Sequence, residues 1–250
     1  MNSDRESVEQ AKQSFDRILD NRKYAGIIKD DNHLALLLSL ADCGGTDRVL
    51  DIGTGTGYLA FALAERFPEA RVCGIDIAKR IVEKNNAAAL EKGLHNLTFE
   101  AFDGLMYPFP EESFDLIVTR YAFHHFPNAA DSAAQMNRLL RAGGRVLVSD
   151  PLRNEADDSG IIDGFMRVKQ DGHIRFYNTE ELEGIFAENG FMKEKQVITE
   201  MSFPFPQRTA YIELYDKIGD KDRQLYDMGN ENGVVWVKHI AVGNIVFVKQ

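Results

Sequence analysis

The order of apolar and polar positions divides the chain into three parts. Apolar residues recur with helical spacing at 3–19 and, in a more buried run, at 34–41. From there to residue 150, short apolar runs typical of strands alternate with amphipathic runs typical of helices. The expected strands are 48–52, 71–77, 97–101, 114–119 and 145–149, and the expected helices are 58–67, 78–91 and 129–141. Beyond residue 150 we expect one helix at 179–189 and β-rich segments at 191–203 and 234–249.

Five short apolar strands that alternate with helices predict a parallel sheet covered on both faces. The fold class is therefore α/β, with a doubly wound sheet. We expect the two β-rich segments near the end of the chain to complete this sheet, with residues 205–229 as an insertion between them. A separate domain there would be very small, so a single domain is the preferred interpretation.

The composition and net charge of the chain limit the kinds of partner that it can bind. The chain has 250 residues, 44% of them hydrophobic, and a formal net charge of -10. Nucleic acid repels such a chain unless a basic patch overrides the balance, and no run of Lys and Arg does so. Cys43 and Cys73 belong to no Cys-x-x-Cys or Cys/His cluster, so we expect reduced thiols and no metal site.

No targeting signal is visible near the start of the chain. The first residues lack signal-peptide character, and the apolar run at 34–41 is far shorter than the roughly 20 residues that span a bilayer. We therefore expect a cytoplasmic protein without a membrane span.

The strongest chemical signal is Asp-Ile-Gly-Thr-Gly-Thr-Gly at residues 51–57, between the first strand and its helix. Glycines there allow a tight turn and close approach of a ligand, and open α/β sheets bind ligands at this edge. A dinucleotide fingerprint would need glycine where Tyr58 stands. Asp51 opposes a pyrophosphate but suits a ligand with an ammonium and a sulfonium, which S-adenosylmethionine carries. A plain structural turn and a degenerate dinucleotide site remain alternatives.

Two further acids follow the next strands. Asp76 ends the second strand, where a carboxylate can accept hydrogen bonds from ribose hydroxyls, and Ile77 can pack on an adenine. Asp103 and Gly104 follow the third strand, where an acid can accept from the adenine amino group. Asp76 as a cap of the next helix, and Asp103-Gly104 as a simple turn, are the alternatives. Thr119 lies at the ligand end of the fourth strand.

Together, the glycine turn and the three acids resemble the class I S-adenosylmethionine-dependent methyltransferases. The closer likeness is to the small-molecule branch that includes the ubiquinone and menaquinone C-methyltransferases. The resemblance covers about residues 47–151, including Leu-Arg-Ala-Gly-Gly-Arg at 140–145, a common lead-in to the fifth strand. It implies a Rossmann-like, seven-stranded, mostly parallel sheet of order 3-2-1-4-5-7-6 in which the last strand, strand 7, is antiparallel.

The resemblance also implies a function for each part of the chain. It predicts an N-terminal helical lid at 1–45, a cofactor-binding core at 46–150, and substrate-side insertions and last strands at 151–250. It implies Asp76 on the ribose, Asp103 near the adenine and the glycine turn at the methionine moiety. The expected binding residues for S-adenosylmethionine are Tyr24, Asp51, Gly53, Thr54, Gly55, Asp76, Ile77, Asp103, Gly104 and Thr119.

Departures from other branches narrow the acceptor. The stretch after the fourth strand, 119–125, lacks the Asn/Asp-Pro-Pro-aromatic motif of enzymes that methylate base amines, and the paired glutamates of protein-arginine methyltransferases. We therefore expect methyl transfer to a small molecule. A nicotinamide-dependent oxidoreductase and a non-catalytic S-adenosylmethionine-binding regulator are the alternatives. Residues 161–166 and 205–226 are expected to wall the acceptor pocket or to form ordinary core or a homodimer contact.

The candidate catalytic pair is His124 and Asp150. His124 lies in Phe-His-His-Phe after the fourth strand, and Asp150 ends the fifth strand. The two strands are neighbours in the expected sheet, so a carboxylate can fix the tautomer of an imidazole that takes a proton from the acceptor. Such a pair resembles the arrangement in some small-molecule O-methyltransferases. Adjacent histidines point in different directions, so His125 is the weaker candidate, and either histidine can instead cap the next helix or bond a loop carbonyl.

Overall fold

The computed structural model describes residues 2–18 and 29–250, so the expected cofactor residue Tyr24 lies outside the described residues. Its sheet has the order β3-β2-β1-β4-β5-β8-β6, with β7 paired to β8. The strands are β1 (Arg48–Ile52), β2 (Arg71–Asp76), β3 (Leu97–Ala101), β4 (Phe114–Arg120), β5 (Leu140–Pro151), β6 (Phe191–Pro204), β7 (Met228–Glu231) and β8 (Val234–Lys249). The first five are parallel, and β8 is antiparallel to both β5 and β6.

The predicted strand order is confirmed, with β8 in the place of the antiparallel seventh strand. The sheet also has one strand more than expected, because β7 and β8 form a hairpin. Asn232 and Gly233 connect them, both in the left-handed region at φ 54° and 81°. Asn-Gly favours this two-residue turn, whose twist matches that of the flanking strands.

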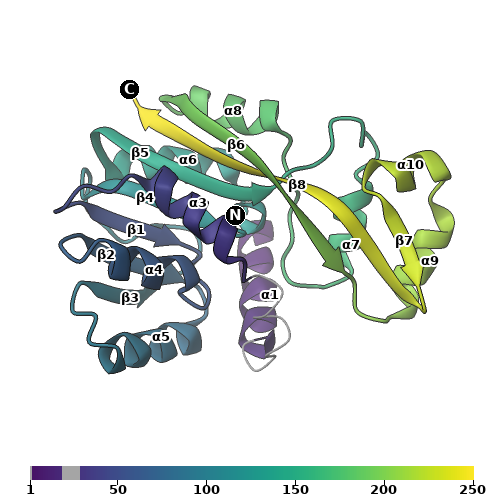
Figure 1. Ribbon diagram of the computed structural model, residues 1–250, viewed down its shortest axis with the longest axis horizontal. Coiled ribbons are helices and arrows are strands. Elements are labelled where there is room, and N and C mark those ends of the chain that lie inside the picture. The colour runs from purple at the N-terminus through teal and green to yellow at the C-terminus, as the bar shows by residue number, and fades with distance from the viewer. Residues whose placement is uncertain (1, 19–28) are drawn as a thin grey trace.

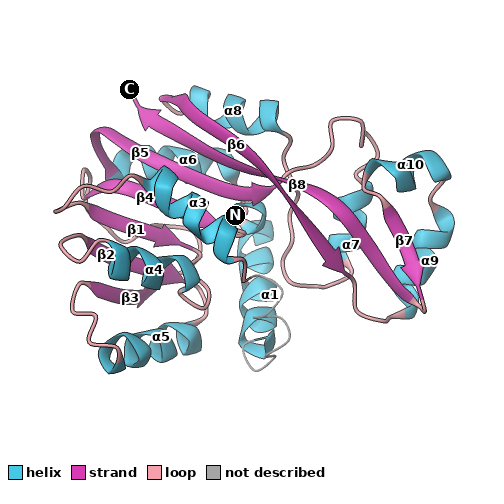
Figure 2. Ribbon diagram, in the orientation of Figure 1, coloured by secondary structure: helices cyan, strands magenta, loops and turns pink. Residues whose placement is uncertain are grey.

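Helices cover both faces of the sheet, as the alternating pattern predicts (Figures 1 and 2). One face packs against α3 (Asp31–Ala41), α4 (Tyr58–Arg66) and α5 (Lys79–Glu91), and the other against α6 (Ala129–Leu139) and α8 (Thr179–Glu188). The N-terminal helix α1 spans Asn2–Ile18. No described helix is long and apolar enough to cross a bilayer.

The predicted end of one helix was wrong. Helix α6 ends at Leu139 and not at the predicted residue 141, and the two glycines at 143–144 lie within β5. The register between β4 and β5 shifts there, since Phe114 pairs with Leu140 and Leu116 pairs with Arg145. The glycines therefore shape an irregularity of the strand, with Gly143 at φ 71°.

Strands β6 and β8 extend beyond the sheet into a lobe formed with β7, α7 (Ile161–Arg167), α9 (Thr209–Lys217) and α10 (Asp220–Leu225) (Figure 2). This lobe has its own apolar cluster, which includes Phe165, Phe205 and Tyr211. Phe165 and Tyr211, expected as pocket walls, are each 1% exposed and stack with 6.4 Å between ring centroids. Their burial supports the alternative that they form ordinary core.

Candidate active site

The glycine turn lies at the carboxyl end of β1 and is tied to the end of β2. The backbone N–H groups of Gly53 and Thr54 both donate to the carbonyl of Ile75, at 2.9 and 3.0 Å. Gly53 has φ 71°, and a β-carbon there would lie 2.5 Å from Cβ of Ala122. The residue must therefore be glycine for two reasons, its left-handed backbone and the close approach of the loop that follows β4.

Asp51 lies beneath this turn. Its Oδ2 accepts a 2.7 Å hydrogen bond from Oγ1 of Thr54, and the residue is only 2% exposed. Burial raises the pKa of Asp51 to about 7, the Thr54 hydrogen bond opposes the rise, and the charge of Asp76 adds to it. Asp51 and Thr54 thus shape the turn from below and place a titratable carboxyl next to it.

Asp76 braces the same turn from β2. Its Oδ2 accepts from the N–H of Gly55 and its Oδ1 from the N–H of Ala78, both at 2.9 Å. Ala78 is the residue at which α5 is capped, so Asp76 holds the start of that helix and the turn together. Asn85 of α5, which the sequence analysis missed, donates from Nδ2 to the carbonyl of Gly55 at 2.8 Å.

The next residues along this edge of the sheet, Asp103 and Gly104, lie where helix α1 packs. Oδ1 of the exposed Asp103 accepts from the N–H groups of Leu105 and Met106, at 2.9 and 2.8 Å, so this carboxylate organises a turn. A β-carbon at Gly104, with φ 81°, would lie 2.7 Å from Val8 of α1 and 3.0 Å from Ile77. Helix α1 and Ile77 therefore both lie against Gly104, and Ile77 and Gly104 are the two expected adenine contacts.

The end of β4 carries a cation and a buried hydroxyl. Thr119 is 1% exposed, and its Oγ1 has no hydrogen-bond partner among the described residues. The guanidinium of Arg120 lies 5.0 Å from the ring centroid of Tyr58 and 4.1 Å from that of Tyr121. Burial lowers the pKa of Arg120, and its charge acts on Asp51 beneath the turn.

The structure brings His124 and Asp150 together. His124 lies in η1 (Phe123–His125), and its Nδ1 is 2.9 and 3.0 Å from the two carboxylate oxygens of Asp150. The backbone N–H of His124 also donates to Oδ2, at 3.1 Å. The side chains are 10% and 3% exposed. Burial lowers the pKa of His124 well below its ordinary value, and the charges of His173 and Lys169 lower it further.

Asp150 is held as a hydrogen-bond acceptor. Burial raises its pKa, and N–H groups of His124, Phe123 and Ala122, together with the charge of His173, oppose the rise. A carboxylate that accepts several backbone N–H bonds is stabilised in its charged form. Asp150 therefore orients the imidazole of His124 through Nδ1 and does not engage its other ring nitrogen, Nε2.

A second histidine–aspartate pair faces the first and was missed by the sequence analysis. Nε2 of His173 lies 2.7 Å from Oδ1 of Asp163, which also accepts from the N–H of Phe176. The ring centroids of His173 and His124 are 5.4 Å apart, and both rings pack edge-on against Phe176. The N–H of Ile174 donates to the carbonyl of His124, which fastens this segment to η1. No group of described side chains has the arrangement of a metal site.

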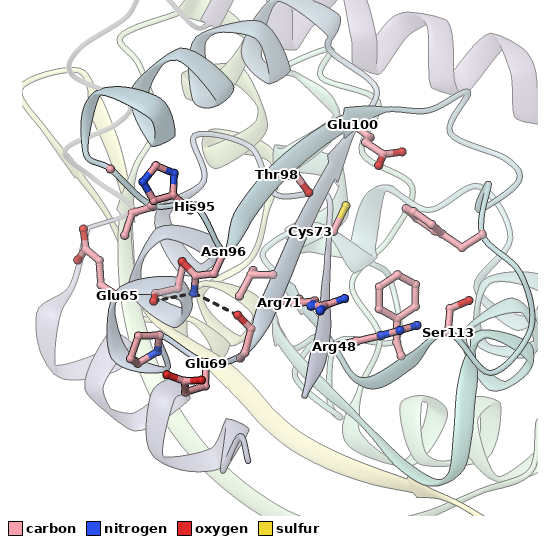
Figure 3. A pocket seen from close by; sticks show the side chains of 18 of the residues that line it. Arg48, Glu65, Glu69, Arg71, Cys73, His95, Asn96, Thr98, Glu100 and Ser113 are labelled. Carbon is pink, nitrogen blue, oxygen red and sulfur yellow. Dashed lines mark hydrogen bonds between the residues drawn. The ribbon is translucent and has the colours of Figure 1, made fainter. Parts of the chain in front are cut away.

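A hollow of about 890 Å³ lies at the opposite end of the sheet (Figure 3). Arg48 and Arg71, which begin β1 and β2, line it together with Cys73 and Glu100. The glycine turn, Asp76 and His124 all lie at the other ends of their strands. This hollow is therefore not the site that the motifs predict.

Comparisons with known proteins decide the class. A family model described as a methyltransferase domain matches residues 44–190. The chain is 30% identical over 204 residues to the uncharacterized methyltransferase YcgJ of Bacillus subtilis, covering 80% of this chain and 77% of that protein. The chain belongs to the methyltransferase domain family. The crystal structure of YcgJ superposes with a TM-score of 0.78 at 25% identity, covering 88% of this chain and 99% of that one.

Other methyltransferases match part of the sequence or share the fold. A demethylmenaquinone methyltransferase of Deinococcus radiodurans is 36% identical over 101 residues, 40% of this chain and 42% of that protein. Geranyl diphosphate methyltransferase, solved in complex with S-adenosylmethionine, shares the fold at 17% identity, with a TM-score of 0.64, 88% of this chain and 85% of that one covered. The enzyme is therefore a methyltransferase, and the alternatives of a nicotinamide-dependent oxidoreductase and a regulator are set aside.

Proposed function

We propose that the enzyme transfers a methyl group from S-adenosylmethionine to a hydroxyl of a small molecule, with His124 as the proton acceptor. The observation that carries this proposal is the buried His124–Asp150 pair beside the glycine turn. Ala122, two residues before His124, touches Gly53 of that turn. Cofactor and acceptor sites are therefore adjacent, as a direct transfer between two bound molecules requires.

The residues present fit S-adenosylmethionine. At Gly55 of the left-handed turn nothing lies within 4 Å of the position that a β-carbon would take, which leaves space for a ligand, and Asp51 supplies a carboxyl that suits its positive groups. In this proposal Asp76, whose two carboxylate oxygens accept from the N–H groups of Gly55 and Ala78, also accepts from the ribose hydroxyls, and Ile77 and Gly104 contact the adenine. In this proposal helix α1, whose Val8 lies against Gly104, serves as a lid over this end. When bound, the cofactor supplies an activated methyl group on a sulfonium.

The His124–Asp150 pair supplies the general base. Asp150 accepts the Nδ1–H of His124, so Nε2 presents a lone pair to the acceptor hydroxyl. During transfer of the methyl group that the cofactor would supply to the acceptor oxygen, the hydroxyl proton would pass to Nε2 of His124. Holding both reactants in line supplies roughly 7–11 kcal/mol, and the base adds to that.

Calorimetry tests the cofactor. We expect S-adenosylhomocysteine to bind and NAD to bind more weakly. Asp76→Ala is expected to weaken S-adenosylhomocysteine by about 1.5–3 kcal/mol, the scale of hydrogen bonds to a charged group. Asp115→Ala is the control, because Asp115 bonds Arg48 and Arg141 at the far end of the sheet. Stronger binding of NAD, or equal affinities of both variants, would contradict the proposal.

Cofactor affinity is also expected to depend on pH through Asp51. Its raised pKa, about 7, means that the free protein holds a proton on Asp51 below that pH. A cationic ligand favours the carboxylate, so binding releases the proton and the affinity for S-adenosylmethionine rises with pH. From pH 6 to pH 8 the gain is about tenfold, the linkage of one proton to binding. Titrations in buffers of different ionisation enthalpy measure the release, and Asp51→Asn should abolish it. A pH-independent affinity would remove Asp51 from cofactor binding.

A further inference from the structure

The last residue of β4 places a guanidinium beside the glycine turn. Asp51 of β1 pairs with Val118 of β4 in the parallel register, so their side chains lie on one face of the sheet. Arg120 is two residues further along β4 on that same face, roughly 7 Å nearer the carboxyl edge. Its guanidinium carbon lies 5.0 Å from the ring centroid of Tyr58, the residue that follows the turn. Arg120 is therefore a cation at the margin of the turn, above the carboxyl of Asp51.

A buried polar network holds a second ring against Arg120. The ring centroid of Tyr121 lies 4.1 Å from the guanidinium carbon, and this ring stacks on His33 of α3 with 5.6 Å between centroids. The Tyr121 hydroxyl is 3.3 Å from Nδ1 of His33, whose Nε2 is 2.8 Å from Oδ1 of the buried Asn244 in β8. Tyr121 also has φ 55°, a strained conformation for a residue other than glycine and one that is typical of active sites. Contacts with α3 and β8 thus fix the ring on which the guanidinium rests.

The chain that leaves β4 contacts the glycine turn at both of its ends. Ala122 lies against the start of the turn, since a β-carbon at Gly53 would be 2.5 Å from Cβ of Ala122. Arg120 lies against Tyr58, at the end of the turn. In the middle of the turn, at Gly55, nothing lies within 4 Å of the position that a β-carbon would take. The structure therefore leaves room for a ligand at the middle of the turn and holds a guanidinium at its margin.

The charges around the turn limit which chemical group fits there. Asp51 lies buried beneath the turn and Asp76 accepts from the N–H of Gly55, so the two carboxyls disfavour a ligand group that carries only negative charge. A guanidinium presents a planar fork of N–H donors that matches a carboxylate, and an aromatic face attracts it without neutralising its charge. A zwitterion meets both signs, because its ammonium can approach the carboxyls while its carboxylate approaches Arg120. The amino-acid end of S-adenosylmethionine is such a zwitterion.

We infer that Arg120 binds the carboxylate at the amino-acid end of S-adenosylmethionine, with its guanidinium held by the rings of Tyr58 and Tyr121. The inference rests on the proposed function, because that function names the cofactor. It adds a binding residue and the cofactor group that this residue recognises. Tyr121 is then a positioning residue that acts through Arg120.

Two probes that differ only in this carboxylate test the inference, S-adenosylhomocysteine and its decarboxylated analogue, which keeps the ammonium. Calorimetry on the full chain should show that S-adenosylhomocysteine binds tenfold or more tightly than the analogue. Arg120→Gln should weaken S-adenosylhomocysteine at least tenfold and the analogue less than twofold, whereas Arg120→Lys should retain part of the preference. Arg141→Gln is the control, because Arg141 pairs with Asp115 at the far end of the sheet, and it should change neither affinity.

The role of Tyr121 is tested with the same two probes. Tyr121→Leu removes the ring beside the guanidinium and should lower the preference for S-adenosylhomocysteine, whereas Tyr121→Phe keeps the ring and should keep most of the preference. A tyrosine that only supports the fold would change the affinities of both probes by the same factor, which would remove Tyr121 from the recognition of the carboxylate.

Equal affinity of the parent enzyme for both probes, or equal losses for both probes in Arg120→Gln, would overturn the inference. The first comparison is made on the unmodified enzyme, so it holds even where a variant folds poorly. Binding of neither probe would defeat the proposed function and the inference with it. Binding of both probes with equal affinity would defeat only the assignment of Arg120.

Discussion

Replacing His124 with alanine is expected to lower the rate of methyl transfer about 10²–10⁴-fold, the contribution of a general base. The affinity for S-adenosylhomocysteine should stay within twofold, because the His124 side chain hydrogen-bonds Asp150, whereas the glycine turn is held by Asp76. The rate of methyl transfer is measured with methyl-labelled S-adenosylmethionine and the acceptor substrate that this label identifies. The affinity is measured by calorimetry. A change in turnover of less than about threefold would leave alignment alone as the mechanism.

Two companion measurements separate a base from a structural histidine. Asp150→Asn keeps the shape of the side chain but no longer fixes the imidazole through a carboxylate, so it should reproduce part of the loss. The pH profile of the parent enzyme should fall on the acidic side as His124 takes up a proton. Burial lowers the pKa of His124, so this fall begins below pH 6.5, and Asp150→Asn should shift it. A profile that is unchanged in His124→Ala would contradict a titrating base.

The parts of the site that were predicted from sequence are those defined by short spacings. The glycine turn and Asp76 follow apolar strands directly, and parallel strands end at a common edge, so their proximity follows from the fold class. The pairing of His124 with Asp150 was predictable for the same reason, because β4 and β5 are neighbours. The roles of these residues toward the cofactor and the acceptor stay predictions.

The parts that were missed depend on contacts between irregular segments. His173 meets Asp163 across ten residues that show no periodicity, through a chain reversal with Gln170 and Gly172 at φ 56° and 78°. Asn85 reaches Gly55 from a helix face whose orientation the apolar pattern does not specify. The hairpin between β7 and β8 is different, because the Asn232-Gly233 pair is a local turn signal that could have been used.

Gly53→Ala is expected to destabilise the enzyme more than Gly143→Ala, although both glycines have φ 71°. Each alanine costs about 1–2 kcal/mol for its left-handed backbone. Only at Gly53 does the new β-carbon meet a neighbour, Cβ of Ala122 at 2.5 Å, whereas nothing lies within 4 Å at Gly143. Overpacking adds about 1–3 kcal/mol. Urea unfolding measures the difference between the two variants, and equal losses of stability would show that the clash is relieved without cost.

The same clash is expected to weaken cofactor binding, because the contact between Gly53 and Ala122 joins the glycine turn to the loop that carries His124. Relief of a 2.5 Å contact must move the turn or the loop, so Gly53→Ala should weaken S-adenosylhomocysteine tenfold or more, while Gly143→Ala leaves its affinity unchanged. Ala122→Gly removes the atom that collides, since the α-carbon of Ala122 lies 3.9 Å away, in ordinary contact. The double variant should therefore recover much of the affinity lost in Gly53→Ala. If it does not, the damage comes from the backbone strain of the turn alone, and the coupling between the turn and the loop of His124 is absent.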